Sequence, residues 1–128
     1  MFAREVMQAS APAREAAVIT KAAVRAAERL GLSARMLAGV LGLSEASVSR
    51  MRRGDFALER GSKPFELAVL LVRLFRSLDA ITGGDETVAQ TWMATDNRAL
   101  GGRPVERITS ISGLTDVLAY LDARRALV

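Results

Sequence analysis

Residues 33–54, SARMLAGVLGLSEASVSRMRRG, predict two short helices joined by a tight turn. Ser33 and Ser44 are residues that cap helix starts, and each precedes a run of apolar residues spaced three and four apart. Gly42 and Gly54 follow the two runs, at positions where glycine commonly ends a helix. The rest of the chain can be interpreted from this helical pair outward.

The spacing within residues 33–54 is that of a helix-turn-helix. Ala38 is small enough to let the two helices approach, and Val48 fills the gap between them. The second helix would present short polar side chains to base edges and arginines to phosphates. The candidate DNA-binding residues are therefore Ser44, Ser47, Ser49, Arg50, Arg52 and Arg53. The pattern resembles the Cro and Xre class of DNA-binding domains, with a helical hairpin that serves only as scaffold as the alternative.

The composition predicts an all-α protein. Half of the 128 residues are hydrophobic and only 5% are aromatic, which favours helices over sheets. The chain has no cysteine and no histidine, which excludes thiol nucleophiles, disulfides, the usual zinc ligands and the commonest general base. A small hydrolase or transferase would need a poised nucleophile or an acid–base pair, and only scattered carboxylates are present. We therefore expect no enzyme activity, no metal site and no cofactor.

The net charge of +4 is concentrated in the N-terminal half. Residues 1–60 contain ten Lys or Arg against six Asp or Glu, whereas residues 61–128 contain eight of each. The excess lies where binding to a polyanion would use it. No signal peptide is recognisable, and the longest apolar run, residues 67–72, is too short to cross a membrane. We expect a soluble, cytoplasmic protein.

The chain divides into three predicted parts. Residues 1–14 lack a periodic apolar face and predict a mobile N-terminal arm. Residues 15–62 contain the helix-turn-helix domain, and residues 63–128 form a C-terminal domain. The first helix of the middle part is expected from residue 15 to residue 30, with an apolar stripe formed by Val18, Ala22, Ala26 and Leu30.

A long hydrophobic helix is predicted to join the two domains, beginning at Pro64 and ending before Gly83. Its side chains are apolar around most of the circumference, so more than one side must be covered. The residues left for water are Glu66, Arg73, Arg76, Ser77 and Asp79. The candidate contacts to a second copy of the chain, in a homodimer, are Phe65, Leu71 and Phe75, with burial in the core alone as the alternative.

Short helices and a glycine turn follow. Asp85 is expected to cap a helix over residues 86–94, and Asn97 to cap the turn. A short helix from Pro104 precedes a final helix, which Ser112 is expected to cap and whose inward residues are Leu114, Val117, Leu118 and Leu121.

Trp92 has two interpretations. As a core residue it would cover the glycine turn, and as an interface residue its ring would be exposed to a partner. We favour the core, because a lone tryptophan in a small helical domain is usually highly buried.

The last residues, 124–128, read RRALV, two arginines followed by three apolar residues. A frayed end is one interpretation. A plug that fills a concave site on another protein is the other.

Two motifs in the C-terminal half occur in a specific order. The first, W-M-x-x-x-N-x-x-L-G-G-x-P, runs from Trp92 to Pro104, and the second, S-x-x-G-L-x-x-V-L-x-x-L, runs from Ser110 to Leu121. Together with the helix-turn-helix they resemble the MbcA/ParS/Xre antitoxin family, and a ParS-like protein in particular, over residues 15–128. Many relatives carry a glycine shortly after the last helix, where this chain has Ala123-Arg124-Arg125-Ala126.

The resemblance implies a non-enzymatic antitoxin of a type II toxin–antitoxin system. Its partner would be a cognate toxin of the RES class, which consumes NAD or uses it to transfer ADP-ribose, and its C-terminal region would cover the toxin active site. The candidate toxin-binding residues are Arg103, Arg107, Asp122, Arg124, Arg125, Ala126, Leu127 and Val128.

Within that set, we expect the tail to imitate part of the dinucleotide. Val128 would supply a carboxylate and Leu127 an apolar body, while Arg124 and Arg125 would pair with toxin carboxylates. The resemblance also implies that the antitoxin binds the operator DNA of its own operon. The alternative function is a free-standing transcriptional repressor without a toxin partner.

Overall fold

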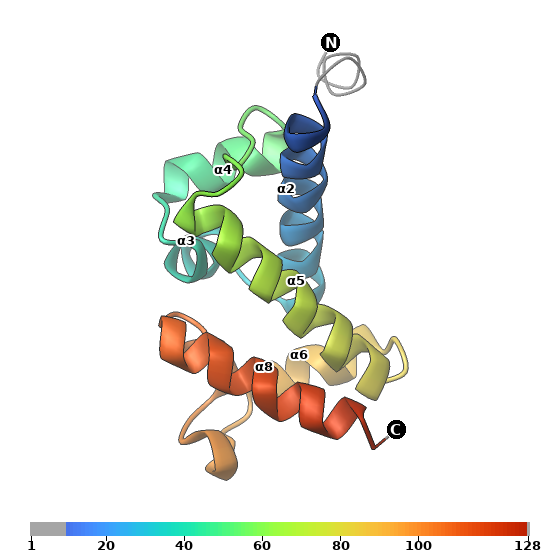
Figure 1. Cartoon of the computed structure of the whole chain (residues 1–128). Helices are drawn as coiled ribbons and strands as arrows, with labels where there is room; N and C mark the ends of the chain where they lie inside the picture. The colour runs from blue at the N-terminus through green and yellow to red at the C-terminus, as the bar shows by residue number, and fades with distance from the viewer. Residues whose placement is uncertain (1–9, 128) are drawn as a thin grey trace.

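A computed structural model describes residues 10–127, which fold into helices joined by short turns (Figure 1). No strand occurs within these residues, and one isolated bridge pairs Asn97 with Gly102. The predicted all-α class is therefore confirmed. The elements are α2 (Ala11–Leu30), α3 (Ala34–Leu41), α4 (Glu45–Arg53), α5 (Lys63–Ile81), α6 (Glu86–Ala94), the 3-10 helix η1 (Arg98–Leu100), α7 (Pro104–Arg107) and α8 (Ile111–Arg125).

Helix α5 lies in the middle of the molecule. It packs against α2 on one side and against α8 on the other (Figure 1). Helix α3 contacts α4 and α5, and α4 also contacts α2. Three α5 leucines, Leu71, Leu74 and Leu78, are fully buried. One hydrophobic cluster includes these leucines together with Leu41 of α3 and Leu121 of α8. The helix-turn-helix half and the C-terminal half therefore share a single core.

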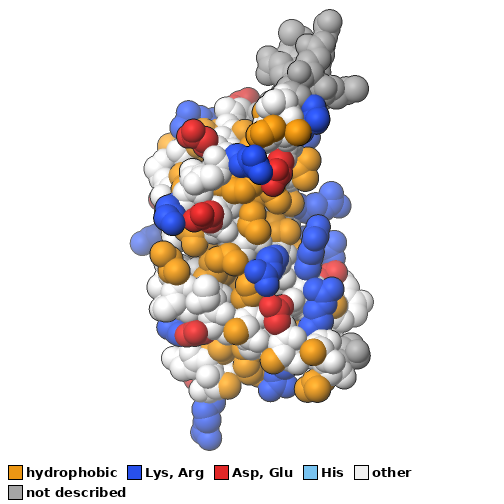
Figure 2. Space-filling view, viewed as in Figure 1, with side chains coloured by type: hydrophobic (Ala, Val, Ile, Leu, Met, Phe, Trp, Pro, Cys, Tyr) orange, Lys and Arg blue, Asp and Glu red, His pale blue; other side chains and the backbone are white. Residues whose placement is uncertain are grey.

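One face of α5 is only partly covered. Figure 2 shows apolar side chains down the middle of this face, over α5, and Lys and Arg side chains along the side where α2 lies. The partly buried side chains include Leu67, Val69 and Leu70. None of the helices within residues 10–127 is long and apolar enough to span a membrane.

Helix α2 differs from its prediction in both its start and its buried face. It begins at Ala11, because the Ser10 hydroxyl accepts from the Ala13 amide and Pro12 occupies the first turn. Residues 11–14 are thus helical, whereas the remainder of the predicted arm, residues 1–9, lies outside the described residues. Val18 is 61% exposed, so the predicted stripe is wrong at that position. The buried residues are mostly small: Ala16, Ala17, Thr20, Ala23, Ala26, Ala27 and Leu30.

The structure corrects three further expectations, two of them about α5. Phe65 and Leu71, two of the three predicted dimer contacts, are 8% and 0% exposed, because the chain's own core covers them. The alternative, burial in the core, therefore accounts for both, while Phe75 is half-buried beneath the Arg29 guanidinium. Ser77, expected to face water, is 1% exposed. Finally, α8 begins at Ile111 and is capped by Ser110 instead of Ser112.

Candidate functional site

The helix-turn-helix forms as predicted. The Ser33 hydroxyl accepts from the Met36 amide at 3.1 Å at the start of α3, and Gly42 ends α3 in the left-handed conformation, with φ of 68°. Val48 is completely buried between the helices. Glycine accepts this backbone conformation without strain, so the turn can hold α4 out from the rest of the domain.

Two of the predicted DNA-binding serines stabilise the start of α4. The Ser44 hydroxyl accepts from the Ser47 amide at 3.1 Å and donates to the Ser47 hydroxyl at the same distance. Ser47 is half-buried, whereas Ser44 is exposed. These hydroxyls therefore act first as a helix cap. Ser49, two residues after Ser47, is half-buried and lies toward the outward side with Arg50 and Arg53.

The three predicted DNA-binding arginines all contact groups of their own chain. Arg50 lies over the Phe56 ring, 5.1 Å from its centroid, and donates to the Ser47 hydroxyl at 3.3 Å. Arg52 donates to the Leu32 carbonyl at 3.0 Å, and Arg53 pairs with Asp55 at 3.3 Å. The Arg53–Asp55 pair is about two-thirds exposed on both sides. Exposed pairs of this kind contribute little to stability, so a phosphate can replace the carboxylate.

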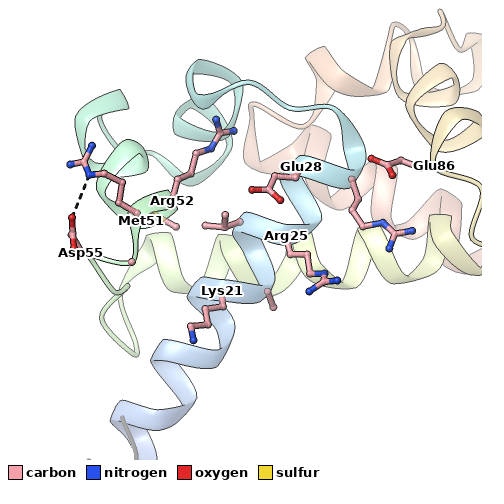
Figure 3. A pocket seen from close by; sticks show the side chains of 12 residues that line it. Lys21, Arg25, Glu28, Met51, Arg52, Asp55 and Glu86 are labelled. Carbon is pink, nitrogen blue, oxygen red and sulfur yellow. Dashed lines mark hydrogen bonds and ion pairs between the residues drawn. The ribbon is translucent and has the colours of Figure 1, made fainter. Parts of the chain in front are cut away.

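A groove of about 900 Å³ lies between α2 and the C-terminal end of α4 (Figure 3). The charged side chains that line it are mostly cationic: Lys21, Arg25, Arg29, Arg52 and Arg53 against Glu28, Asp55 and Glu86. Lys21 and Arg25 were absent from the predicted DNA-binding set. Their spacing of four residues on one side of α2 could have indicated a cationic face, but only the fold brings that face next to α4.

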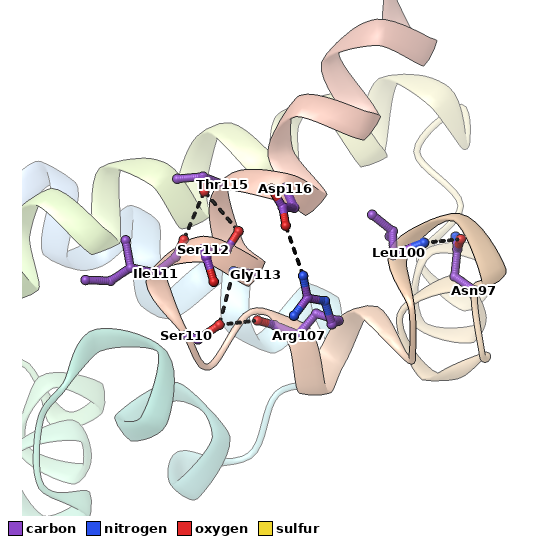
Figure 4. Close-up of polar contacts among 9 residues, drawn as sticks. All are labelled: Asn97, Leu100, Arg107, Ser110, Ile111, Ser112, Gly113, Thr115 and Asp116. Atoms are coloured by element: carbon purple, nitrogen blue, oxygen red, sulfur yellow. Dashed lines mark hydrogen bonds and ion pairs between the residues drawn. The ribbon is translucent and has the colours of Figure 1, made fainter.

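The turn before α7 depends on Asn97 and a glycine (Figure 4). The Asn97 side-chain oxygen accepts from the Leu100 amide at 3.2 Å, as predicted. The backbones of Asn97 and Gly102 exchange two hydrogen bonds, at 3.0 and 3.2 Å. Gly101 has φ of 72°, which side-chain-bearing residues rarely adopt. The N-x-x-L-G-G motif is thus explained by the geometry of the turn.

The S-x-x-G motif joins α7 directly to α8 (Figure 4). The Ser110 hydroxyl accepts from the Gly113 amide at 3.1 Å. A Cβ atom at Gly113 would lie 1.8 Å from the Arg107 carbonyl oxygen, so only glycine fits at this position. The close approach fixes the angle at which α8 leaves the turn.

Trp92 is half-buried, which is intermediate between the two interpretations, a core residue and an exposed interface residue. Its ring packs against the hydrophobic core and stacks on Tyr120 of α8, with centroids 6.2 Å apart and an interplanar angle of 22°. The Arg124 guanidinium lies over the same Tyr120 ring, 4.6 Å from its centroid. We refer to these three residues as the aromatic stack. Sequence reasoning missed Tyr120.

Two predicted toxin-binding residues, Asp122 and Arg125, face α5. The Ser77 hydroxyl donates to the Asp122 carboxylate at 2.7 Å, and Arg125 donates to the Ser77 oxygen at 3.5 Å. Arg73 also pairs with Asp122, at 3.5 Å. These contacts hold the last turns of α8 against α5.

The other predicted toxin-binding residues lie away from α5 or near the end of the chain. Arg103 donates to Glu106 at 2.8 Å, and Arg107 pairs with Asp116 at 3.0 Å. Ala126 and Leu127 are exposed in a turn after α8, and Leu127 is 87% exposed. Val128 lies outside the described residues. The predicted set is therefore spread over several parts of the C-terminal half.

Two family models match the chain. Residues 9–73 match the antitoxin Xre-like helix-turn-helix domain, which covers just over half of the chain. The chain belongs to the Xre-like antitoxin family. Residues 77–126 of the antitoxin match the antitoxin Xre/MbcA/ParS C-terminal toxin-binding domain. The first stretch ends and the second begins within α5. A search among curated proteins finds no match.

These matches assign a partner to each half of the antitoxin. The match of the helix-turn-helix half implies DNA as a binding partner, and the match of the C-terminal half implies a protein toxin. Among residues 10–127, no group of three or more His, Cys, Asp or Glu side chains is placed to hold a metal ion.

Proposed function

We propose that this antitoxin neutralises a RES-class toxin by laying its C-terminal domain over the toxin active site, and that its helix-turn-helix binds the operator of its own operon. The observation that supports toxin binding is the exposure of the end of α8. There, Arg124 and Ala126 are exposed at the end of the stretch that matches the toxin-binding domain, and the exposed Leu127 follows directly after it.

The chemistry of this end suits the pocket of an NAD-using enzyme. Such a pocket has an apolar slot for a ring, and it needs carboxylates or other polar groups for catalysis. Leu127 is 87% exposed and supplies an apolar body, while Arg124 supplies a planar cation that pairs well with a carboxylate. Covering the slot and pairing a catalytic carboxylate would both exclude the substrate.

The proposed inhibition of the toxin is tested by measuring NAD consumption by the purified toxin. The full antitoxin is expected to abolish turnover at equimolar concentration. A variant that lacks residues 126–128 keeps Arg124 and the contacts to α5, and we expect it to bind the toxin but inhibit it less. NAD turnover that is unchanged by the full antitoxin would overturn the proposal, whereas equal inhibition by both forms would remove only the role of the tail.

The proposed binding to operator DNA rests on α4 and the groove beside it. Ser49, Arg50 and Arg53 lie on the outward side of α4, and Lys21 and Arg25 add positive charge on α2. Phosphate contacts of this kind bind any sequence, and base selection needs side chains on α4. Fluorescence anisotropy with DNA from upstream of the operon should show salt-dependent binding that a scrambled duplex weakens. Equal binding to both duplexes would contradict autoregulation.

A further inference from the structure

We propose that the aromatic stack, Trp92, Tyr120 and Arg124, is the centre of the surface that binds the toxin. This inference rests on the proposed function, because it names the part of the C-terminal domain that meets the toxin. Trp, Tyr and Arg are the three residue types most enriched at positions that dominate the affinity of protein interfaces. Here all three lie on the matched toxin-binding domain, and Tyr120 contacts both Trp92 and Arg124.

The stack is held in place before any partner binds. Trp92 and Tyr120 are each next in sequence to a fully buried residue, Met93 and Leu121, which anchor α6 and α8 in the core. Both rings are half-buried, so each has one part in the core and another part that a partner can reach. Rigid side chains lose little freedom on binding, which favours affinity.

Two members of the stack, Tyr120 and Arg124, lie within a stripe along α8. Asp116, Tyr120 and Arg124 are spaced four residues apart and therefore lie on one side of the helix. The stripe begins at the pair between Arg107 and Asp116 and leads toward the exposed Leu127. It thus connects three predicted toxin-binding residues, Arg107, Arg124 and Leu127.

The opposite flank of α8 is occupied by the chain itself. Asp122 and Arg125 bond to the buried Ser77 of α5. On α6, Val88 lies one turn before Trp92 and is 49% exposed, so it widens the apolar part of the surface. A partner that docks on the stripe therefore meets apolar rings with the Arg124 cation at one end and the Arg107–Asp116 ion pair at the other.

This chemistry defines the toxin patch that fits. The patch should offer an apolar wall to Trp92 and Tyr120 and a carboxylate to Arg124. A guanidinium can donate two parallel hydrogen bonds to a carboxylate while its face stays on an aromatic ring. Closure of the patch over the rings would exclude water from that ion pair and strengthen it.

The test measures the affinity of the full antitoxin for the RES-class toxin that co-purifies with it, by isothermal titration calorimetry. Tyr120→Ala should weaken binding at least about 30-fold, and Arg124→Gln about tenfold. Tyr120→Phe keeps the ring and should stay within about threefold of the parent. The matched controls are Val18→Ala and Arg60→Gln on the helix-turn-helix half, which should leave the affinity unchanged.

Melting curves of each variant separate a binding role from a structural one. A stack that only joins α6 to α8 would lower the melting temperature and leave the affinity of the folded variant unchanged, and that result would overturn the proposal. If Tyr120→Ala is unfolded, Arg124→Gln decides alone, because the Arg124 side chain is exposed. If no toxin co-purifies with the parent antitoxin, the proposed function itself fails. If the parent binds the toxin and the variants bind it equally well, only the role of the aromatic stack fails.

Discussion

The outward sides of α4 and α8 hold their arginines in different ways. On α4, the exposed residues Arg50, Arg52 and Arg53 contact a ring, a carbonyl and a carboxylate of their own chain, and each does so separately from the other two. On α8, Arg124 rests on Tyr120, which stacks on Trp92. A polyanion is attracted by charge with little demand on shape, whereas a protein partner is held by rigid, partly buried anchors. The contrast supports DNA for the first surface and a toxin for the second.

The largest expected effect comes from Gly113, on which the α8 surface depends and the α4 surface does not. Gly113→Ala would place a Cβ atom 1.8 Å from the Arg107 carbonyl, so α7 and α8 must separate. We expect a loss of about 3 kcal/mol in the free energy of unfolding, as for severe overpacking. The loss is measured by chemical denaturation of the variant and of the parent.

Gly39→Ala is the matched control, because its Cβ atom would meet Thr109 at an ordinary distance of 3.5 Å. Alanine is favoured over glycine within a helix, so stability should be kept or slightly increased. A Gly113→Ala variant as stable as the parent would refute the close fit between α7 and α8.

Arg50 is expected to have the next largest effect, on base selection by α4. Arg50→Gln should reduce the difference in binding free energy between the operator and a mutated operator by roughly 1–3 kcal/mol. Binding to both duplexes is measured by anisotropy at one salt concentration. Arg60→Gln makes the same charge change away from α4, where Arg60 pairs with Glu15, and should leave the difference intact. An equal loss in both variants would mean that Arg50 acts only by its charge.

Ser77 should have a smaller effect, confined to the inner flank of α8. Ser77→Ala removes the hydroxyl that bonds to Asp122 at 2.7 Å and accepts from Arg125. Because Asp122 is partly exposed and keeps Arg73 as a partner, we expect a loss of about 1 kcal/mol in unfolding free energy. Thermal melts should show no change for Ser112→Ala, which removes the hydroxyl of an exposed serine on α8. A Ser77→Ala melt identical to that of the parent would argue against the importance of this contact.

The smallest expected effect is on the salt dependence of DNA binding. Arg53→Gln and Arg25→Gln should each reduce the slope of log affinity against log salt by about 1, without changing which sequence is preferred. Arg124→Gln on α8 should leave the slope unchanged. If Arg124→Gln lowers the slope as much as Arg53→Gln does, DNA also meets the α8 surface and the comparison between the two surfaces fails.

Local signals in the sequence predicted much of the fold. Serine caps and glycine ends located α3 and α4, and the apolar spacing identified the inward side of α8, with Leu114, Val117 and Leu121 buried as expected. The early start of α2 had a signal, Ser10 followed by Pro12, that was interpreted as part of an arm. The buried side of α2 was harder to predict, because alanine makes a helix equally apolar on several sides and close packing with α5 then decides.

The candidate sites were less predictable, because they depend on residues far apart in the chain. Ser77 looked like a surface residue because its partner Asp122 lies 45 positions later. Tyr120 was missed because its significance comes from Trp92 on another helix, and Lys21 and Arg25 were missed because only the fold places them beside α4. Residue types and spacing indicated the two functions, but the surfaces themselves required tertiary structure.

The most direct test of the account is hydrogen–deuterium exchange of the antitoxin, free and bound to its toxin. We predict that the toxin slows exchange in α6 and in the second half of α8, while α3 and α4 exchange as in the free antitoxin. Slower exchange confined to α4, with α6 and α8 unchanged, would contradict the central claim that the toxin binds the aromatic stack and leaves the helix-turn-helix open to DNA.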